Sequence, residues 1–503
     1  MGTRSKQIAE FGFLRLDARR KTPLFRQLYE QLRLAVLQGR LQANDRIPSS
    51  RDLVKQLGIS RTTAVTAIEL LISEGYLQTI HGRGTFVCSE IPDEVLLPAD
   101  VAELSSLESR GSTNYLSAFG RAAESFDRSQ WHTGAPVPFC PGEPALDEFP
   151  IEVWSRIVRR VWKSASVSDL SYGEPAGHPT LRAQIADYLS VHRGVNCSAS
   201  QVMIVNGTQQ AVDIISRIAL NPGDPVLFEN PGYLSARNAF EKRGNDIIPL
   251  AVDDEGIQIR EAIEQDVDAR LAYVTPSHQF PMGVTLPIER RMELIKWAED
   301  HDALILEDDY DSEYRYSGRP LPSLQGLDRS ARTIYVGSFS KVVFPALGLG
   351  YAIVPPPMIT AFENALKLSS RPGSKIDQIV LSEFIREGHF VRHLRKMRKT
   401  HSERRETFVA AFEKHLADKL TLVGAAAGLH CTTLFDSPKV SDTHSVAHLA
   451  KAGIIARPLS SYFADSTPRT RRRNGLVFGF ASATPGTTKR RLREVGKLLD
   501  EVT

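Results

Sequence analysis

The 503-residue chain has 42% hydrophobic and 24% charged residues, which is ordinary for a globular protein. No apolar run is long enough to span a bilayer, and the N-terminal stretch MGTRSKQIAEFGF lacks the apolar segment of a secretory signal. We therefore expect a cytoplasmic protein that does not associate with membranes. The four cysteines have neither metal-ligand nor disulfide spacing, so we expect reduced thiols and no metal site.

The net charge of +3 is unevenly distributed. Residues 1–88 contain 14 Lys and Arg against 7 Asp and Glu, a net charge of +7, so the remainder carries −4. A small basic unit joined to a mildly acidic body indicates that the first unit contacts a polyanion. The length predicts two or three domains.

The N-terminal segment has the pattern of three short helices. Apolar spacing predicts a helix over residues 23–39. The stretch IPSSRDLVKQLGISRTTAVTAIELLISEGYL predicts two more, with Ser49 or Ser50 capping the first, Gly58 turning the chain and Ser60 capping the second. A helix, a tight glycine turn and a second helix form a helix-turn-helix. The residues expected to face inward are Leu53, Val54 and Leu57, then Val65, Ile68, Leu71 and Ile72.

The following stretch YLQTIHGRGTFV predicts a hairpin with the tip His81-Gly82-Arg83-Gly84. A glycine-rich tip with one arginine suits a wing that lies along a DNA backbone or minor groove. A generic three-helix bundle with an incidental hairpin is the alternative. The order, spacing and shared basic charge of the elements favour DNA binding.

This segment resembles the GntR-type winged helix in PSSRDL, LGISRTT, EGYL and GRGTFV, over roughly residues 22–88. The resemblance implies a DNA-binding domain over residues 1–88 that reads a double-stranded operator. Residues at the start of a recognition helix reach base edges, and arginine can bind guanine through two hydrogen bonds. The DNA contacts it implies are Arg51, Arg61, Thr62, Thr63, Gly82 and Arg83.

Residues 89–135 are acidic and interrupted by proline, without sustained periodicity, and we expect a linker there with a short helix near residues 99–107. From residue 136 onward, short β-branched runs alternate with amphipathic helical runs. This alternation predicts a mixed α/β fold whose C-terminal domain, residues 136–503, has a largely parallel sheet. Ligands of such sheets lie beyond the carboxyl ends of the strands.

Three groups of functional residues follow three of the predicted strands. Gly207 and Thr208 follow VMIV and open a helix, where exposed N–H groups favour an anion such as phosphate. Asp308 and Tyr310 follow ALILE and can address two edges of a heteroaromatic ring. Lys341 follows TIYVGSFS, and a lysine at a strand end is a candidate Schiff-base amine.

The C-terminal body resembles the class I aminotransferases, the fold type I proteins that bind pyridoxal 5'-phosphate, over roughly residues 136–500. The matching motifs include SYGEPAGHPTLRAQIADYLSVHRGV, FENPGY, TPSHQFPMG, EDDYDSEYRY and GSFSKVVFPALGLGY. The resemblance implies that Lys341 forms the internal aldimine and that Asp308 pairs with the pyridinium nitrogen. It further implies that Tyr310 bonds the phenolic oxygen and Tyr233 stacks on the ring. The phosphate ligands it implies are Gly207, Thr208 and Ser338.

Two positions depart from that pattern. Gly348 stands where the family has a phosphate-binding arginine, and the loss of such a contact removes about 1.5–3 kcal/mol of binding. Phe280 stands where the family has an asparagine beside the ring oxygen, and the neighbouring His278 and Gln279 could line the pocket. The late strand over residues 475–483 has no arginine for a substrate carboxylate. Arg457 is the candidate effector ligand, with residues 471–473 as alternatives.

The two resemblances together match the MocR/GabR branch of bacterial GntR regulators. This implies a homodimeric regulator of transcription in which an amine, an amino acid or pyridoxal phosphate itself acts as the small-molecule effector. We expect at most weak transaminase activity. Two alternatives stay open. The first is a competent aminotransferase that carries a DNA-binding unit, and the second is a regulator whose large domain has lost the cofactor, for which Gly348 is the argument.

Overall fold

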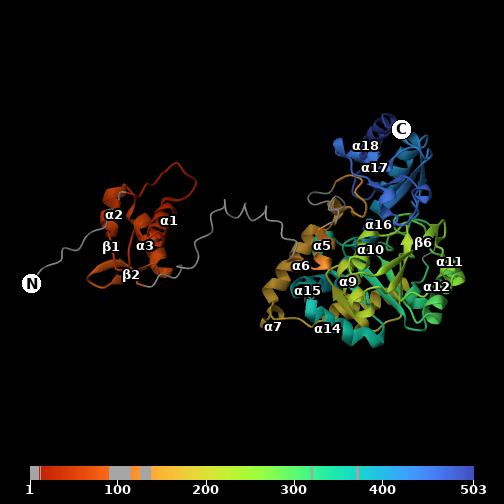
Figure 1. Ribbon diagram of the computed structural model, residues 1–503, viewed down its shortest axis with the longest axis horizontal. Coiled ribbons are helices and arrows are strands. Elements are labelled where there is room, and N and C mark those ends of the chain that lie inside the picture. The colour runs from red at the N-terminus through yellow and green to blue at the C-terminus, as the bar shows by residue number, and fades with distance from the viewer. Residues whose placement is uncertain are drawn as a thin grey trace, which may run out of the picture. The chain divides into compact units, whose positions relative to one another are not determined.

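The computed structural model describes residues 11, 13–89, 115–124, 137–318, 321–369 and 373–502, in two compact units, Met1–Tyr115 and Leu116–Thr503 (Figure 1). The boundary lies inside the segment expected to link the domains. That segment contains a helix that its sequence pattern did not indicate, α5 (Ala118–Glu124). The helix expected near residues 99–107 lies outside the described residues. Within these ranges, no helix combines the length and apolarity needed to cross a bilayer.

The first unit packs three helices against a small antiparallel sheet of order β1-β3-β2. Ser49 accepts the Asp52 backbone N–H, Gly58 ends the second helix in the left-handed conformation with φ +66°, and Ser60 accepts the Thr63 N–H. On the third helix, Ile68, Leu71 and the partly buried Ile72 contribute to the core, as expected. Val65 is only partly buried, whereas Ala64 and Ala67 are fully buried. The elements are α1 (Leu24–Leu37), β1 (Arg46–Ile47), α2 (Ser50–Leu57), α3 (Arg61–Ser73), β2 (Leu77–Ile80) and β3 (Gly84–Val87).

The second unit is built on an eight-stranded sheet of order β4-β11-β10-β9-β8-β5-β6-β7. The pairs from β10 through β9, β8 and β5 to β6 are parallel, whereas β11 runs antiparallel to both of its neighbours. The sheet is therefore largely parallel, as expected. Its strands are β4 (Val202–Val205), β5 (Pro225–Asn230), β6 (Asp246–Asp253), β7 (Gly256–Ile257), β8 (Leu271–Val274), β9 (Leu304–Asp309), β10 (Thr333–Ser338) and β11 (Gly350–Ile353).

Helices cover both faces of this sheet, which is why its strands are buried on both sides. Residues of α9, α10 and α14 pack against one face. On the other face, α8, α15 and α16 cover one end of the sheet and α11 and α12 cover the other. The helices are α8 (Pro179–Arg193), α9 (Thr208–Ala219), α10 (Leu234–Glu241), α11 (Ile259–Glu264), α12 (Ile288–Asp300), α14 (Ile359–Ser369), α15 (Lys375–Arg386) and α16 (His389–His415).

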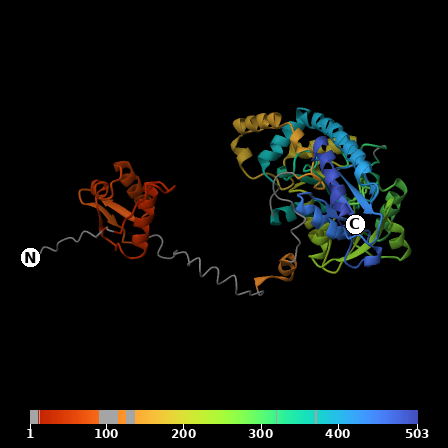
Figure 2. The ribbon, with the colours of Figure 1, turned by 90° about the horizontal axis from the view of Figure 1, so that it is seen from above.

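The chain ends in a separate four-stranded antiparallel sheet of order β12-β13-β15-β14. The long helix α16 leads into this sheet and packs along α18, as both views show (Figures 1 and 2). The C-terminal sheet thus has its own helical layer. Its elements are β12 (Leu420–Val423), β13 (His430–Phe435), α17 (Asp442–Lys451), β14 (Arg457–Pro458), β15 (Gly475–Gly479) and α18 (Pro485–Asp500).

Candidate cofactor site and nucleic-acid interface

Lys341 lies just beyond the end of β10, beside the carboxyl end of β9. The parallel register pairs Val336 with Asp308, which brings the two strand ends together. A Cβ added to Gly142 would lie 3.0 Å from the lysine Nζ, so a larger residue at this position would crowd the amine. Burial lowers the pKa of the Lys341 amine, and nearby carboxylates, Asp311 first among them, oppose that shift. A lowered pKa favours the neutral, nucleophilic amine.

Asp308 is buried at the end of β9 with only one of its carboxylate oxygens occupied. Tyr273, on the neighbouring strand β8, donates a 2.6 Å hydrogen bond to Oδ2. Oδ1 has no hydrogen-bond partner in the described part of the chain. Burial raises the pKa of the carboxyl group to about 7, and the Tyr273 bond opposes that shift. A buried carboxylate oxygen without a donor fits a ligand that brings an N–H, such as a pyridinium ring.

The two predicted tyrosines have different surroundings. The Tyr310 hydroxyl donates to the His278 carbonyl at 2.8 Å and lies 3.1 Å from Nδ1 of the same histidine. The partly buried Tyr233 packs edge-on against Phe280, with ring centroids 5.6 Å apart. Phe280 thus replaces a polar group with an apolar contact, and the Gln279 amide is engaged elsewhere, donating to Glu229 and to the Pro231 carbonyl.

The predicted phosphate ligands lie at the ends of β4 and β10. Gly207 precedes α9, a 12-residue helix that begins at Thr208, and a Cβ at Gly207 would meet nothing within 4 Å. Open space at the N-terminus of a helix suits an anion. Ser338 accepts a hydrogen bond from the Ser340 backbone N–H. Gly350 begins β11, the strand between β4 and β10. It allows close packing at this point, because a Cβ there would lie only 3.0 Å from the Gly207 Cα.

Gly348 has a left-handed backbone with φ +62°, at the end of a short 3₁₀ turn (Pro345–Leu347). A side chain at this position has open space but a strained backbone. An arginine here therefore requires a conformation that L-residues rarely adopt.

Arg457 lies on β14 at the edge of the C-terminal sheet, partly buried. Burial raises the pKa of the Cys140 thiol to about 11, and the positive charge of Arg457 partly opposes that shift. The same charge opposes the rise in the pKa of Tyr462 that burial causes. The positive charge of Lys341 also lowers the pKa of the Cys140 thiol. Of the alternatives, Arg472 donates to three backbone carbonyls and is structural.

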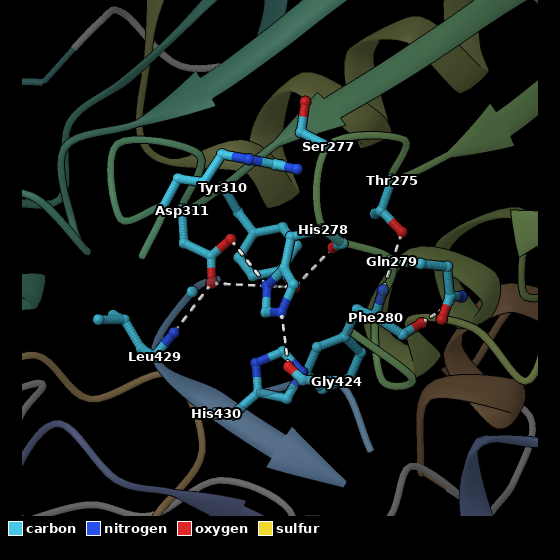
Figure 3. Close-up of polar contacts among 12 residues, drawn as sticks. Thr275, Ser277, His278, Gln279, Phe280, Tyr310, Asp311, Gly424, Leu429 and His430 are labelled. Carbon is cyan, nitrogen blue, oxygen red and sulfur yellow. Dashed lines mark hydrogen bonds and ion pairs between the residues drawn. The ribbon is translucent and has the colours of Figure 1, made fainter. Parts of the chain in front are cut away.

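Reasoning from the sequence did not identify three polar residues of this region, Tyr273, Asp311 and His430. It named His278 but not its contacts. His278 Nδ1 and a carboxylate oxygen of Asp311 form a hydrogen bond of 3.1 Å. One ring nitrogen each of His278 and His430 and one carboxylate oxygen of Asp311 lie within 4.8 Å of one another (Figure 3). A tyrosine in the apolar run LAYV was one available signal. The distance of His430 along the chain left no local signal for that residue.

Most of the predicted DNA contacts are exposed on the first unit. Arg51 lies in the first turn of α2, Arg61 and Thr62 open α3, and Gly82 and Arg83 form the turn between β2 and β3. Thr63 differs, because it is partly buried and its hydroxyl lies 2.8 Å from the Ser60 hydroxyl. Thr63 therefore contributes to the helix cap.

Comparison with known families matches both units. Residues 24–87 match the bacterial regulatory proteins of the gntR family, and residues 136–472 match aminotransferase class I and II. The chain is 38% identical to the probable rhizopine catabolism regulatory protein MocR of Rhizobium meliloti, over 94% of this chain and 93% of that one. This chain is a MocR-type GntR regulator.

Other similarities agree with that assignment. The pyridoxine biosynthesis regulator PdxR of Corynebacterium glutamicum is 32% identical over 95% of this chain and 97% of its own. Among solved structures, LysN, an α-aminoadipate aminotransferase of Thermus thermophilus, has a TM-score of 0.70 and 25% identity, covering 77% of this chain and 99% of that one. The MocR-type chain therefore joins a helix-turn-helix of the gntR family to a fold type I aminotransferase-like domain.

Proposed function

We propose that this regulator holds pyridoxal 5'-phosphate on Lys341 and senses a small amine or amino acid there, or the cofactor itself, to control its binding to operator DNA. The observation that carries the proposal is Oδ1 of Asp308, a buried carboxylate oxygen that accepts no hydrogen bond from the described residues and lies near the partly buried Lys341. An unsatisfied buried oxygen is unfavourable unless a ligand completes its hydrogen bond.

The other residues divide the binding of the cofactor among them. Gly207, Thr208 and Ser338 would hold the phosphate, Tyr233 would cover the ring face and Tyr310 would address the phenolic oxygen. When bound, the cofactor supplies a carbonyl carbon that reacts with primary amines and a ring that withdraws electrons. Asp308 keeps the ring nitrogen protonated, and Arg457 is the candidate for an acidic group of the effector.

A homodimer completes the proposal. Large apolar side chains lie exposed together on α6 (Ile151–Ser164), α7 (Val167–Leu170) and the residues after them, with Val167 87% and Tyr172 81% exposed. One of them, Tyr172, lines a surface cavity of about 390 Å³ formed with the start of α15. An exposed apolar patch of this kind suits a protein interface. A twofold dimer would present two DNA-binding units to two half-sites.

The direct test compares the wild type with Lys341→Ala. Duplexes selected from a random pool serve as the operator, and binding is measured with pyridoxal phosphate present, with and without GABA, taurine or another amino acid. For an effector, we expect about a 5- to 150-fold change in the DNA Kd of the wild type and none in the variant, since an effector shifts affinity only through unequal binding to two states. A full response in Lys341→Ala would overturn the proposal.

A second candidate function, transamination, is favoured by one observation: the groups that the chemistry needs, Lys341, Asp308 and Tyr310, all lie at neighbouring strand ends. An assay across amino donors with an α-keto acid acceptor separates the two. Many turnovers per site would favour the enzyme, whereas a single turnover or none is expected for the sensor.

A further inference from the structure

The loops that carry Tyr310 and His278 meet the C-terminal sheet at one buried cluster (Figure 3). His278 follows β8, and Tyr310 and Asp311 follow β9, so all three lie in loops at the edge of the eight-stranded sheet. Gly424, Gly428 and Leu429 lie between β12 and β13 of the C-terminal sheet. The side chains of His278 and Asp311 are each 1% exposed. The cluster therefore joins two parts of the unit beside the proposed cofactor site.

The hydroxyl of Tyr310 has one proton, and that proton is already engaged. It is donated to the His278 carbonyl at 2.8 Å. A hydroxyl donates only one hydrogen bond, so Tyr310 can donate to a ring oxygen only by releasing His278. The hydrogen bond of Tyr310 is therefore linked to the position of the His278 backbone.

His278 in turn is held by Asp311. Both oxygens of the Asp311 carboxylate lie 3.1 Å from His278 Nδ1, within hydrogen-bond distance. The same carboxylate accepts the backbone N–H of Leu429 at 3.2 Å. Asp311 thus contacts one loop of the eight-stranded sheet and one loop of the C-terminal sheet.

The fit between the two sheets leaves no space at this point. A Cβ at Gly428 would lie 2.1 Å from His278 Cε1 and 2.4 Å from Asp311 Oδ2. Gly283, a few residues after His278, is equally close to Gly424, since its Cβ would lie 2.5 Å from the Gly424 Cα. Close-packed groups transmit a displacement because they cannot absorb it.

We infer that His278 and Asp311 are positioning residues that couple the hydrogen bond of Tyr310 to the seating of residues 424–430. This coupling would connect the cofactor site to the C-terminal sheet, and to that extent it rests on the proposed function. Its physical content, the coupling between Tyr310 and residues 424–430, exists in the cofactor-free protein. The coupling can therefore be tested separately.

The test is a double-mutant cycle on the full chain without cofactor, read by amide hydrogen exchange of residues 424–430. The four proteins are the wild type, Tyr310→Phe, Asp311→Asn and the double variant. We expect Tyr310→Phe to speed exchange by about twofold to a hundredfold in the wild type and to change nothing in the Asp311→Asn background. If the contact is purely structural, the effects of the two substitutions on the exchange rates add. Additive effects, or no effect of Tyr310→Phe, would overturn the inference.

A replacement variant, a control variant and a separate assay of cofactor retention complete the test. If Asp311→Asn does not fold, His278→Gln replaces it in the same cycle with the same expectation. His301→Asn is the control, because the partly buried His301 hydrogen-bonds the Trp297 carbonyl on α12, away from the cluster. It should leave the Tyr310→Phe effect intact. Cofactor retention, measured separately by borohydride trapping, reports on the proposed function alone.

Discussion

Tyr273 donates a 2.6 Å hydrogen bond to Oδ2 of Asp308, while the other oxygen, Oδ1, has no hydrogen-bond partner among the described residues. The parallel register of β8, β9 and β10 places this pair and Lys341 at adjacent strand ends. The arrangement has consequences for cofactor binding, for the pH dependence of stability and for the role of Gly348.

The substitution Asp308→Asn should weaken cofactor binding without changing the shape of the site. Removal of a charge-assisted hydrogen bond lowers affinity by about tenfold to a hundredfold. Titration of the apoprotein with pyridoxal phosphate, followed by absorbance, measures the change. The melting temperature of the variant checks that the fold is intact, and an unchanged Kd would contradict the role given to Asp308.

The same carboxyl group should make the stability of the cofactor-free protein depend on pH. Burial raises the pKa of Asp308 from 3.8 to about 7, so the folded state holds the proton more tightly than the unfolded state does. Its contribution is fully present below about pH 4 and is lost as the pH rises through 7. Relative to Asp308→Asn, the wild type should lose up to about 4 kcal/mol of unfolding free energy across that window. Parallel stability curves for the two proteins would exclude this assignment.

Gly348→Arg should bind the cofactor more tightly and fold less stably. The left-handed backbone at φ +62° disfavours any side chain by about 1–2 kcal/mol, while a guanidinium can add a charge-assisted bond to phosphate. Gly348→Ala is the control, since it has the strain without the charge. If the arginine variant binds no better than the alanine variant, residue 348 does not face the phosphate.

On the DNA-binding unit, Arg61→Ala should reduce operator affinity by about 1–3 kcal/mol and relax the preference for one base. Arg83→Ala, in the turn of the wing, should weaken binding evenly across sequences and reduce its salt dependence. Binding to selected and scrambled duplexes at two salt concentrations distinguishes these effects. Equal losses on both duplexes for Arg61→Ala would contradict base reading by the start of α3.

Much of this architecture could be predicted from local patterns. Ser60 and Gly58 occupy the cap and turn that the sequence indicated, and alternation of strands and helices predicted the parallel sheet. Residues that follow consecutive parallel strands must share one edge, which is why Lys341 and Asp308 could be brought together without coordinates.

The rest depends on tertiary relationships that a local pattern does not contain. The role of Tyr273 follows from the register of β8 against β9, and the contact of Asp311 with Leu429 joins residues 118 positions apart. The pattern also did not identify Ala64 and Ala67, which are fully buried on α3, whereas the expected inward residue Val65 is only partly buried. The helix α5 lies in a segment whose composition indicated a linker with a short helix elsewhere, near residues 99–107.

Reduction with borohydride after addition of pyridoxal phosphate, followed by mass mapping of the peptides, tests the central claim most directly. The account predicts a visible absorbance band that borohydride removes, with the added mass fixed on Lys341 and absent from Lys341→Ala. A protein that shows no band and no added mass at excess cofactor, or that carries the mass on other lysines alone, would contradict the account.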